Sequence, residues 1–77
     1  MIVLLRRIDP EENMNRWYMV QIQPTLLDPI AVICSWGNRD TAWVRSRILP
    51  MGSREQAQEE AEKIIATKIK RGYVRIQ

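Results

Sequence analysis

The stretch that decides the fold is Ile30-Ala-Val-Ile-Cys-Ser-Trp36-Gly37-Asn38-Arg39-Asp40-Thr-Ala-Trp43-Val-Arg45-Ser-Arg47-Ile-Leu49. It consists of two apolar runs, with polar residues interleaved, on either side of Gly-Asn-Arg-Asp. Glycine and asparagine tolerate a positive φ, and aspartate closes turns through its own carboxylate. The stretch therefore predicts a hairpin of two antiparallel strands joined by a tight turn.

The register of this hairpin follows from the length of its turn. With an even number of turn residues, the predicted pairs are Trp36 with Thr41, Cys34 with Trp43, Val32 with Arg45 and Ile30 with Arg47. One face then carries two tryptophans and two arginines. The other face carries small or branched side chains and is predicted to pack under a helix: Ala31, Ile33, Ser35, Ala42, Val44, Ser46 and Ile48. An odd turn or a bulge would break this sorting.

Two further strands are predicted before the hairpin. Residues 2–8 are rich in branched side chains and are closed by Asp9-Pro10. Residues 16–23 alternate, with Tyr18, Val20 and Ile22 on one face, and Pro24 ends the run.

A helix is predicted after Gly52. Ser53 has the position of an N-cap, and Gln56 three residues later completes a capping box. Acidic residues at the start of this segment and basic residues at its end match the helix dipole. Gly72 is the expected left-handed residue beyond the helix, and residues 73–76 are a short last strand. The fold class is therefore α+β: a small antiparallel sheet of four to five strands, order ββββαβ, with one helix packed on one face, in a single domain over residues 1–77.

The composition limits the functions that are open to the chain. It has 77 residues, a net charge of +3, no histidine and one cysteine. A lone Cys34 cannot form an internal disulfide, so we expect a reduced, unreactive sheet residue in a cytoplasmic protein. No apolar run approaches the roughly 18 residues of a membrane helix, and the N-terminus lacks the order of a signal peptide, so we expect no membrane partner.

Catalytic signals are absent from the sequence. Histidine is the commonest general base and metal ligand, and a lone cysteine without histidine lacks its usual activating partner. The three glycines form no phosphate-binding loop. We expect no enzyme activity, no metal site, no cofactor and no small-molecule substrate.

Three short motifs, in order along the chain, carry a resemblance to a known family. They are Asn15-Arg16-Trp17-Tyr18, Ser35-Trp36-Gly37, and Lys68-Ile-Lys70-Arg71-Gly72-Tyr73 after the capped helix. This order resembles the WGR domain, known from the DNA-dependent poly(ADP-ribose) polymerases and from short bacterial proteins. The usual WGR pattern opens with Asn-Lys-Phe-Tyr, carries Trp-Gly-Arg in the central hairpin and closes with Lys-x-Lys-x-Gly-Tyr. The resemblance covers about Asn15 to Tyr73.

The resemblance implies an antiparallel sheet with one helix that contacts the end of a broken DNA strand. It implies that Trp36 lies against the terminal sugar, with the opening and closing motifs close by. The chain departs from the family at Asn38, which stands where the motif arginine belongs, and the glycine-rich stretch after it is shortened. Arg39 comes one residue late and reaches the same region only if the turn redirects it.

Two functions follow from these patterns. The first is a non-catalytic nucleic-acid-binding module for DNA strand ends or nicks, with contacts from Trp36, Asn15, Arg16, Arg39, Lys68, Lys70, Tyr73, Arg45 and Arg47. The alternative is a protein-protein interaction or self-association module, a homodimer included, that uses the uncovered sheet face. Its apolar contacts would come from Ile30, Val32, Trp36 and Trp43. Binding to phosphates weakens steeply with salt, whereas apolar docking does not.

Several of these residues also have plain structural interpretations. Trp36 is equally consistent with a core aromatic, and Trp17 and Trp43 are expected to be structural. Alternating aromatic and basic residues from Trp43 to Arg47 suit a groove that holds a nucleic-acid strand, or an exposed strand that is protected by charge. The basic residues at the end of the helix also interact favourably with its dipole.

Overall fold

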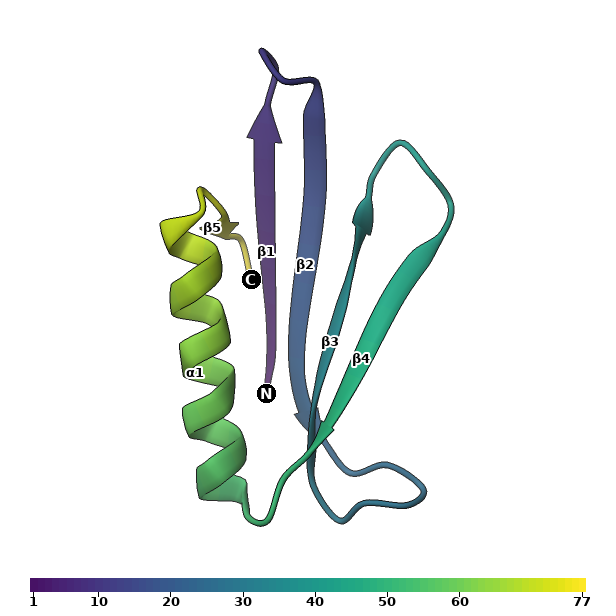
Figure 1. The fold of residues 1–77 in the computed structure, drawn as a ribbon, viewed down its shortest axis with the longest axis vertical. Coiled ribbons are helices and arrows are strands. Elements are labelled where there is room, and N and C mark those ends of the chain that lie inside the picture. Colours follow the sequence, from purple (N-terminus) through teal and green to yellow (C-terminus); the bar gives the residue numbers. More distant parts are fainter.

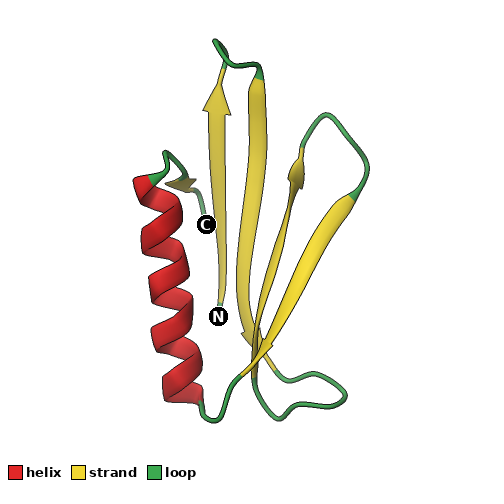
Figure 2. Cartoon of the chain, in the orientation of Figure 1, coloured by secondary structure: helices red, strands yellow, loops and turns green.

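The computed structural model describes residues 1–77 and consists of one antiparallel sheet and one helix (Figures 1 and 2). The strands are hydrogen-bonded in the order β4-β3-β2-β1-β5. The elements are β1 (Ile2–Asp9), β2 (Met14–Gln23), β3 (Ala31–Asn38), β4 (Val44–Pro50), α1 (Arg54–Lys70) and β5 (Val74–Arg75). The predicted α+β class and the order ββββαβ are confirmed. No helix of the structure has the length and apolar character needed to span a membrane.

The connection between β3 and β4 is longer than the predicted tight turn. Trp36 pairs with Arg45, Cys34 with Arg47 and Val32 with Leu49, so the predicted pairs are wrong by four residues. The chain leaves the sheet after Asn38, whose Oδ1 accepts the Asp40 N–H at 2.8 Å and whose carbonyl accepts the Thr41 N–H at 3.2 Å. Residues 39–43 therefore form a loop. Because the shift is even, each side chain that lies in β3 or β4 keeps the face that was predicted for it, whereas Thr41, Ala42 and Trp43 lie in the loop.

The helix covers the opposite face of the hairpin from the one predicted. The core contains Val32 and Cys34 of β3 together with Val20 of β2 and the fully buried Ala57 and Ala61 of α1. The reason is the register of β2 and β3, which aligns Val20 with Cys34. Large apolar side chains of the two strands thus share one face, and burial of this face removes more apolar surface from water. The two alanines let the helix approach the sheet closely.

Both ends of α1 have the predicted caps. Ser53 Oγ accepts the Gln56 N–H at 3.1 Å, and Gln56 Oε1 accepts the Gly52 N–H at 3.0 Å. At the other end, Gly72 has a φ of +100°, and its N–H bonds to the Ile69 carbonyl at 3.0 Å. The Tyr73 N–H bonds to the Lys68 carbonyl at 3.1 Å, which completes a Schellman motif. The left-handed conformation that was predicted for Gly72 is confirmed.

The loop between β2 and β3 is held by its own polar groups. Thr25 Oγ1 donates to Asp28 Oδ2 at 2.9 Å and accepts the Asp28 N–H at 3.0 Å, and the Thr25 N–H bonds to the Asp28 carbonyl at 2.9 Å. The tip presents Leu26 and Leu27, which are 104% and 93% exposed. This loop lies at the end of the molecule where α1 begins (Figure 1).

Candidate functional site

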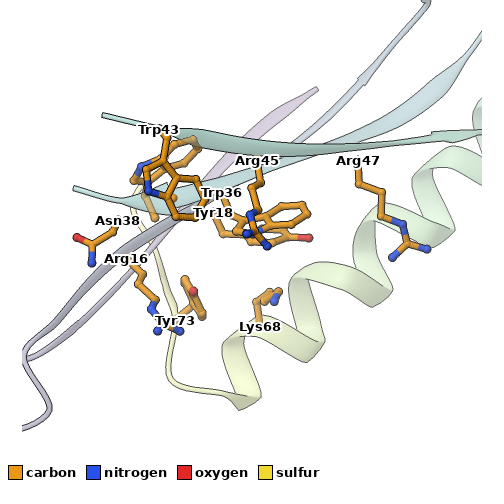
Figure 3. A pocket seen from close by; sticks show the side chains of 11 residues that line it. Arg16, Tyr18, Trp36, Asn38, Trp43, Arg45, Arg47, Lys68 and Tyr73 are labelled. Atoms are coloured by element: carbon orange, nitrogen blue, oxygen red, sulfur yellow. The ribbon is translucent and has the colours of Figure 1, made fainter. Parts of the chain in front are cut away.

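A pocket of about 570 Å³ lies where β2 and β4 begin and where β3 and α1 end. Five segments of the chain contribute to it, and Figure 3 shows side chains from the strands and from the helix surrounding one space. It is lined by Arg16, Trp17, Tyr18, Trp36, Gly37, Asn38, Trp43, Arg45, Arg47, Lys68 and Tyr73.

The inner wall of the pocket is aromatic. Tyr18 and Trp36 are direct neighbours across β2 and β3, and their rings are stacked, with centroids 5.7 Å apart and an interplanar angle of 13°. Tyr73 meets Tyr18 edge to face at 6.2 Å. Trp36 is half-buried and packs against the core, so it is part of the core boundary and of the pocket wall at once. Stacked rings of this kind offer a flat apolar platform to a ligand.

Lys68 extends over this aromatic wall. Its Nζ lies 4.4 Å from the Tyr18 ring centroid and 5.8 Å from that of Tyr73, within the range of cation–π attraction. The Schellman motif explains the geometry, because it folds Tyr73 back beside Lys68. Burial, followed by the nearby positive charge of Arg71, lowers the pKa of Lys68 from its usual 10.5.

Tyr18 remains a neutral phenol in this setting. Burial is the main cause that raises its pKa above the usual value, and a hydrogen bond with Cys34 acts in the same direction. The phenol therefore adds no negative charge that would offset the positive charge of the pocket.

Arginines supply the remaining positive charge. Arg45 and Arg47 are two residues apart on β4 and point to the face that α1 covers in part, where Arg45 lies 4.9 Å above the Trp43 ring. Arg16 enters from β2, paired with Asn38 of β3. With Lys68, four cationic side chains line the pocket and no acidic side chain does. Such a pocket has a positive potential that favours anionic ligands.

Six of the nine site residues expected from the sequence line this pocket: Trp36, Arg16, Lys68, Tyr73, Arg45 and Arg47. Asn15, Arg39 and Lys70 do not. Asn15 is next to Arg16 in a strand and so points to the opposite face, and its carbonyl accepts the Arg39 N–H at 2.9 Å. Arg39 is exposed in the loop. Lys70 follows Lys68 by two residues and is therefore about 200° further around the helix.

The sequence interpretation missed Tyr18 and assigned Trp17 and Trp43 to structural roles. Trp43 is 57% exposed and stacks with Arg45, so it contributes little to the core. The Trp17 ring lies against Gly37, where an added Cβ would be 3.1 Å from the indole Nε1. Because Gly37 has no side chain, the Trp17 indole can pack closely against the backbone of β3 at this position. The contact between Tyr18 and Trp36 could not be predicted from their spacing in the sequence, since only the register of β2 and β3 brings them together.

The fold is a small antiparallel sheet with one helix, and its pocket combines cationic and aromatic side chains. The chain belongs to the WGR domain family, which matches residues 1–77 and confirms the resemblance seen in the sequence. The WGR domain is known as a nucleic-acid-binding module in proteins like the poly(ADP-ribose) polymerases.

A relative in Sinorhizobium fredii (strain NBRC 101917 / NGR234), the uncharacterized protein y4dW, is 32% identical over 69 residues. The match covers 90% of this chain and 33% of the relative, so the chain spans about a third of that protein's length. No solved structure matches the chain.

Proposed function

We propose that this chain is a non-catalytic module that binds DNA strand ends or nicks in the aromatic pocket. The observation that carries the proposal is the set of four cations, Arg16, Arg45, Arg47 and Lys68, around stacked aromatic rings with no carboxylate among them. Cations bind the phosphates and release their counterions, while aromatic rings stack on bases or sugars. Asn15, Arg39 and Lys70 are left out of the proposed contacts because they lie outside the pocket.

The shape of the site supports ends rather than continuous duplex. An internal nucleotide in a duplex is covered by stacked neighbours on both sides, whereas a terminal or nicked nucleotide has a free side. Trp36 is half-buried in the wall of the pocket, and a nucleotide with such a free side offers a surface that can lie against it. A terminal phosphate also brings more charge than an internal one to cations that are gathered in one place.

Fluorescence anisotropy with matched DNA probes tests the proposal. We expect a nicked or linear duplex to bind more tightly than a closed circle of the same sequence. Trp36→Ala is expected to lose about 1–3 kcal/mol of binding free energy with little change in salt dependence. Arg16→Ala is expected to lower the slope of log K against log salt by about one. Lys70→Ala, outside the pocket, is the matched control. Equal binding of the closed and the open probe would refute the preference for ends.

A second candidate function, docking of a protein or of another copy, rests on the uncovered face of the sheet. Ile2, Ile8, Val44 and Ile48 are 60%, 55%, 55% and 53% exposed. The apolar contacts expected from the sequence need correction, because Ile30 and Val32 are buried under α1. We expect Ile48→Asp to abolish any salt-resistant self-association in sedimentation equilibrium, and a monomer at all concentrations would exclude a homodimer.

The proposal includes no catalysis and no cofactor. The free thiol of Cys34 favours a reducing compartment, for which we propose the cytoplasm. Residues 1–77 are proposed to form one domain because a single core cluster joins the sheet to the helix.

A further inference from the structure

A second hollow lies beside the helix and adjoins the aromatic pocket. This hollow, of about 280 Å³, is lined by Tyr18, Arg47, Glu60, Lys63, Ile64, Thr67 and Lys68. Tyr18, Arg47 and Lys68 line both spaces, so this second hollow, hereafter the groove, directly adjoins the aromatic pocket. Figure 3 shows Arg47 extending from β4 toward α1, on the same side of the helix as Lys68.

The groove exists because α1 does not reach the edge of the sheet. Its buried alanines, Ala57 and Ala61, pack it against β2 and β3, whereas nearly all of β4 is exposed. The helix residues of the groove recur every three or four positions and so form one line along the helix. From Lys68 to Glu60 this line is about 12 Å long at about 1.5 Å per residue.

We propose that this groove binds the unpaired tail of a DNA strand whose paired end occupies the aromatic pocket. The inference rests on the proposed function and adds a substrate class to it, namely ends with a short single-stranded overhang. Arg47, Lys63 and Lys68 provide charge for the phosphates. The ring of Tyr18 and the side chain of Ile64 provide apolar surface for a base. The volume of the groove, about 280 Å³, is close to the lower limit of about 300 Å³ for ligand sites.

Glu60 sets the far limit of the groove. It is the only carboxylate among the lining residues of either space, and it repels a phosphate. Stacked nucleotides rise by about 3.4 Å each, so 12 Å accommodates about three of them. A tail longer than this gains nothing more from the groove.

The test compares hairpin duplexes that share one sequence and differ only in the tail. The probes are blunt, or carry tails of one, three or six nucleotides on either strand. We expect about tenfold tighter binding with a three-nucleotide tail, the factor that one charge-assisted contact provides, and no further gain with six. Lys63→Ala removes this gain and leaves the blunt probe unaffected, whereas the control Lys70→Ala leaves both unchanged. Glu60→Gln extends the gain to the longer tail.

The outcomes separate the two proposals. If blunt and tailed probes bind equally well and both bind more tightly than a closed circle, the groove proposal is wrong and the end-binding proposal stands. An equal weakening of both probes by Lys63→Ala also refutes the groove as a tail site. If no probe with an end exceeds the closed circle, the end-binding proposal itself fails.

Discussion

Substitution of Gly72 by alanine tests the link between the helix end and the site. At a φ of +100°, a residue with a β-carbon is strained, at a cost of roughly 1–2 kcal/mol. The added Cβ would lie 3.3 Å from Arg7 Nε, and this flexible side chain is free to move. Alanine also restricts the unfolded chain, which offsets about 0.4–1 kcal/mol. We therefore expect a net loss of about 1 kcal/mol in the free energy of unfolding.

Thermal and urea unfolding measure this loss. For a domain of this size, about 1 kcal/mol lowers Tm by about 4–8 °C. Gly72→Asn is the first control, since asparagine tolerates the left-handed region and should lose less. A chemically synthesised chain with D-alanine at position 72 is the second, because D-alanine favours a positive φ and should raise Tm.

Two results would refute this reasoning. If L-alanine and D-alanine give the same Tm, the backbone conformation of residue 72 is not what limits stability. If Gly72→Ala lowers Tm without weakening DNA binding, the Schellman motif does not hold Tyr73 beside Lys68 for binding.

Three further predictions concern single side chains. Gly37→Ala should cost about 1–3 kcal/mol by crowding the Trp17 indole, and should cost clearly less in a Trp17→Ala background; equal costs in a double-mutant cycle would contradict the contact. The lowered pKa of Lys68 means that its charge is lost at a lower pH than for an ordinary lysine, so DNA affinity should fall as pH rises toward 10, while Lys68→Arg keeps it flat. Cys34, which is 1% exposed, should react with a thiol reagent only after unfolding, and rapid labelling of the native protein would show an open core.

The sequence predicted the elements better than their pairing. The signals that start and end α1 act within one turn of the chain, so Ser53 and Gly72 were sufficient to place it. The register of β3 and β4 was wrong because strand alternation has a period of two, and a shift of four residues leaves the pattern unchanged. The face under the helix was also wrong, because both faces of the hairpin carry apolar residues. Only the alignment of Val20 with Cys34, set by β2, decides between them.

The site was predictable only in part for a similar reason. Arg45 and Arg47 stand in an alternating pattern that is visible in the sequence, and the family resemblance indicated Trp36 and Lys68. Tyr18 was missed because its position across from Trp36 depends on the residues between β2 and β3. Asn15, which the sequence analysis grouped with Arg16, does not line the pocket, because neighbours in a strand point to opposite faces.

The loop that carries Leu26 and Leu27 has a consequence for protein engineering. A buried leucine stabilises a fold by about 1.5–3 kcal/mol, but these two bury almost nothing and the loop is held by Thr25 and Asp28 instead. Polar replacements of both leucines should therefore leave the melting temperature unchanged and improve solubility at high concentration. The loop also lies at the opposite end of the long axis from the aromatic pocket (Figure 1). A fluorophore attached there would report on binding without touching the site.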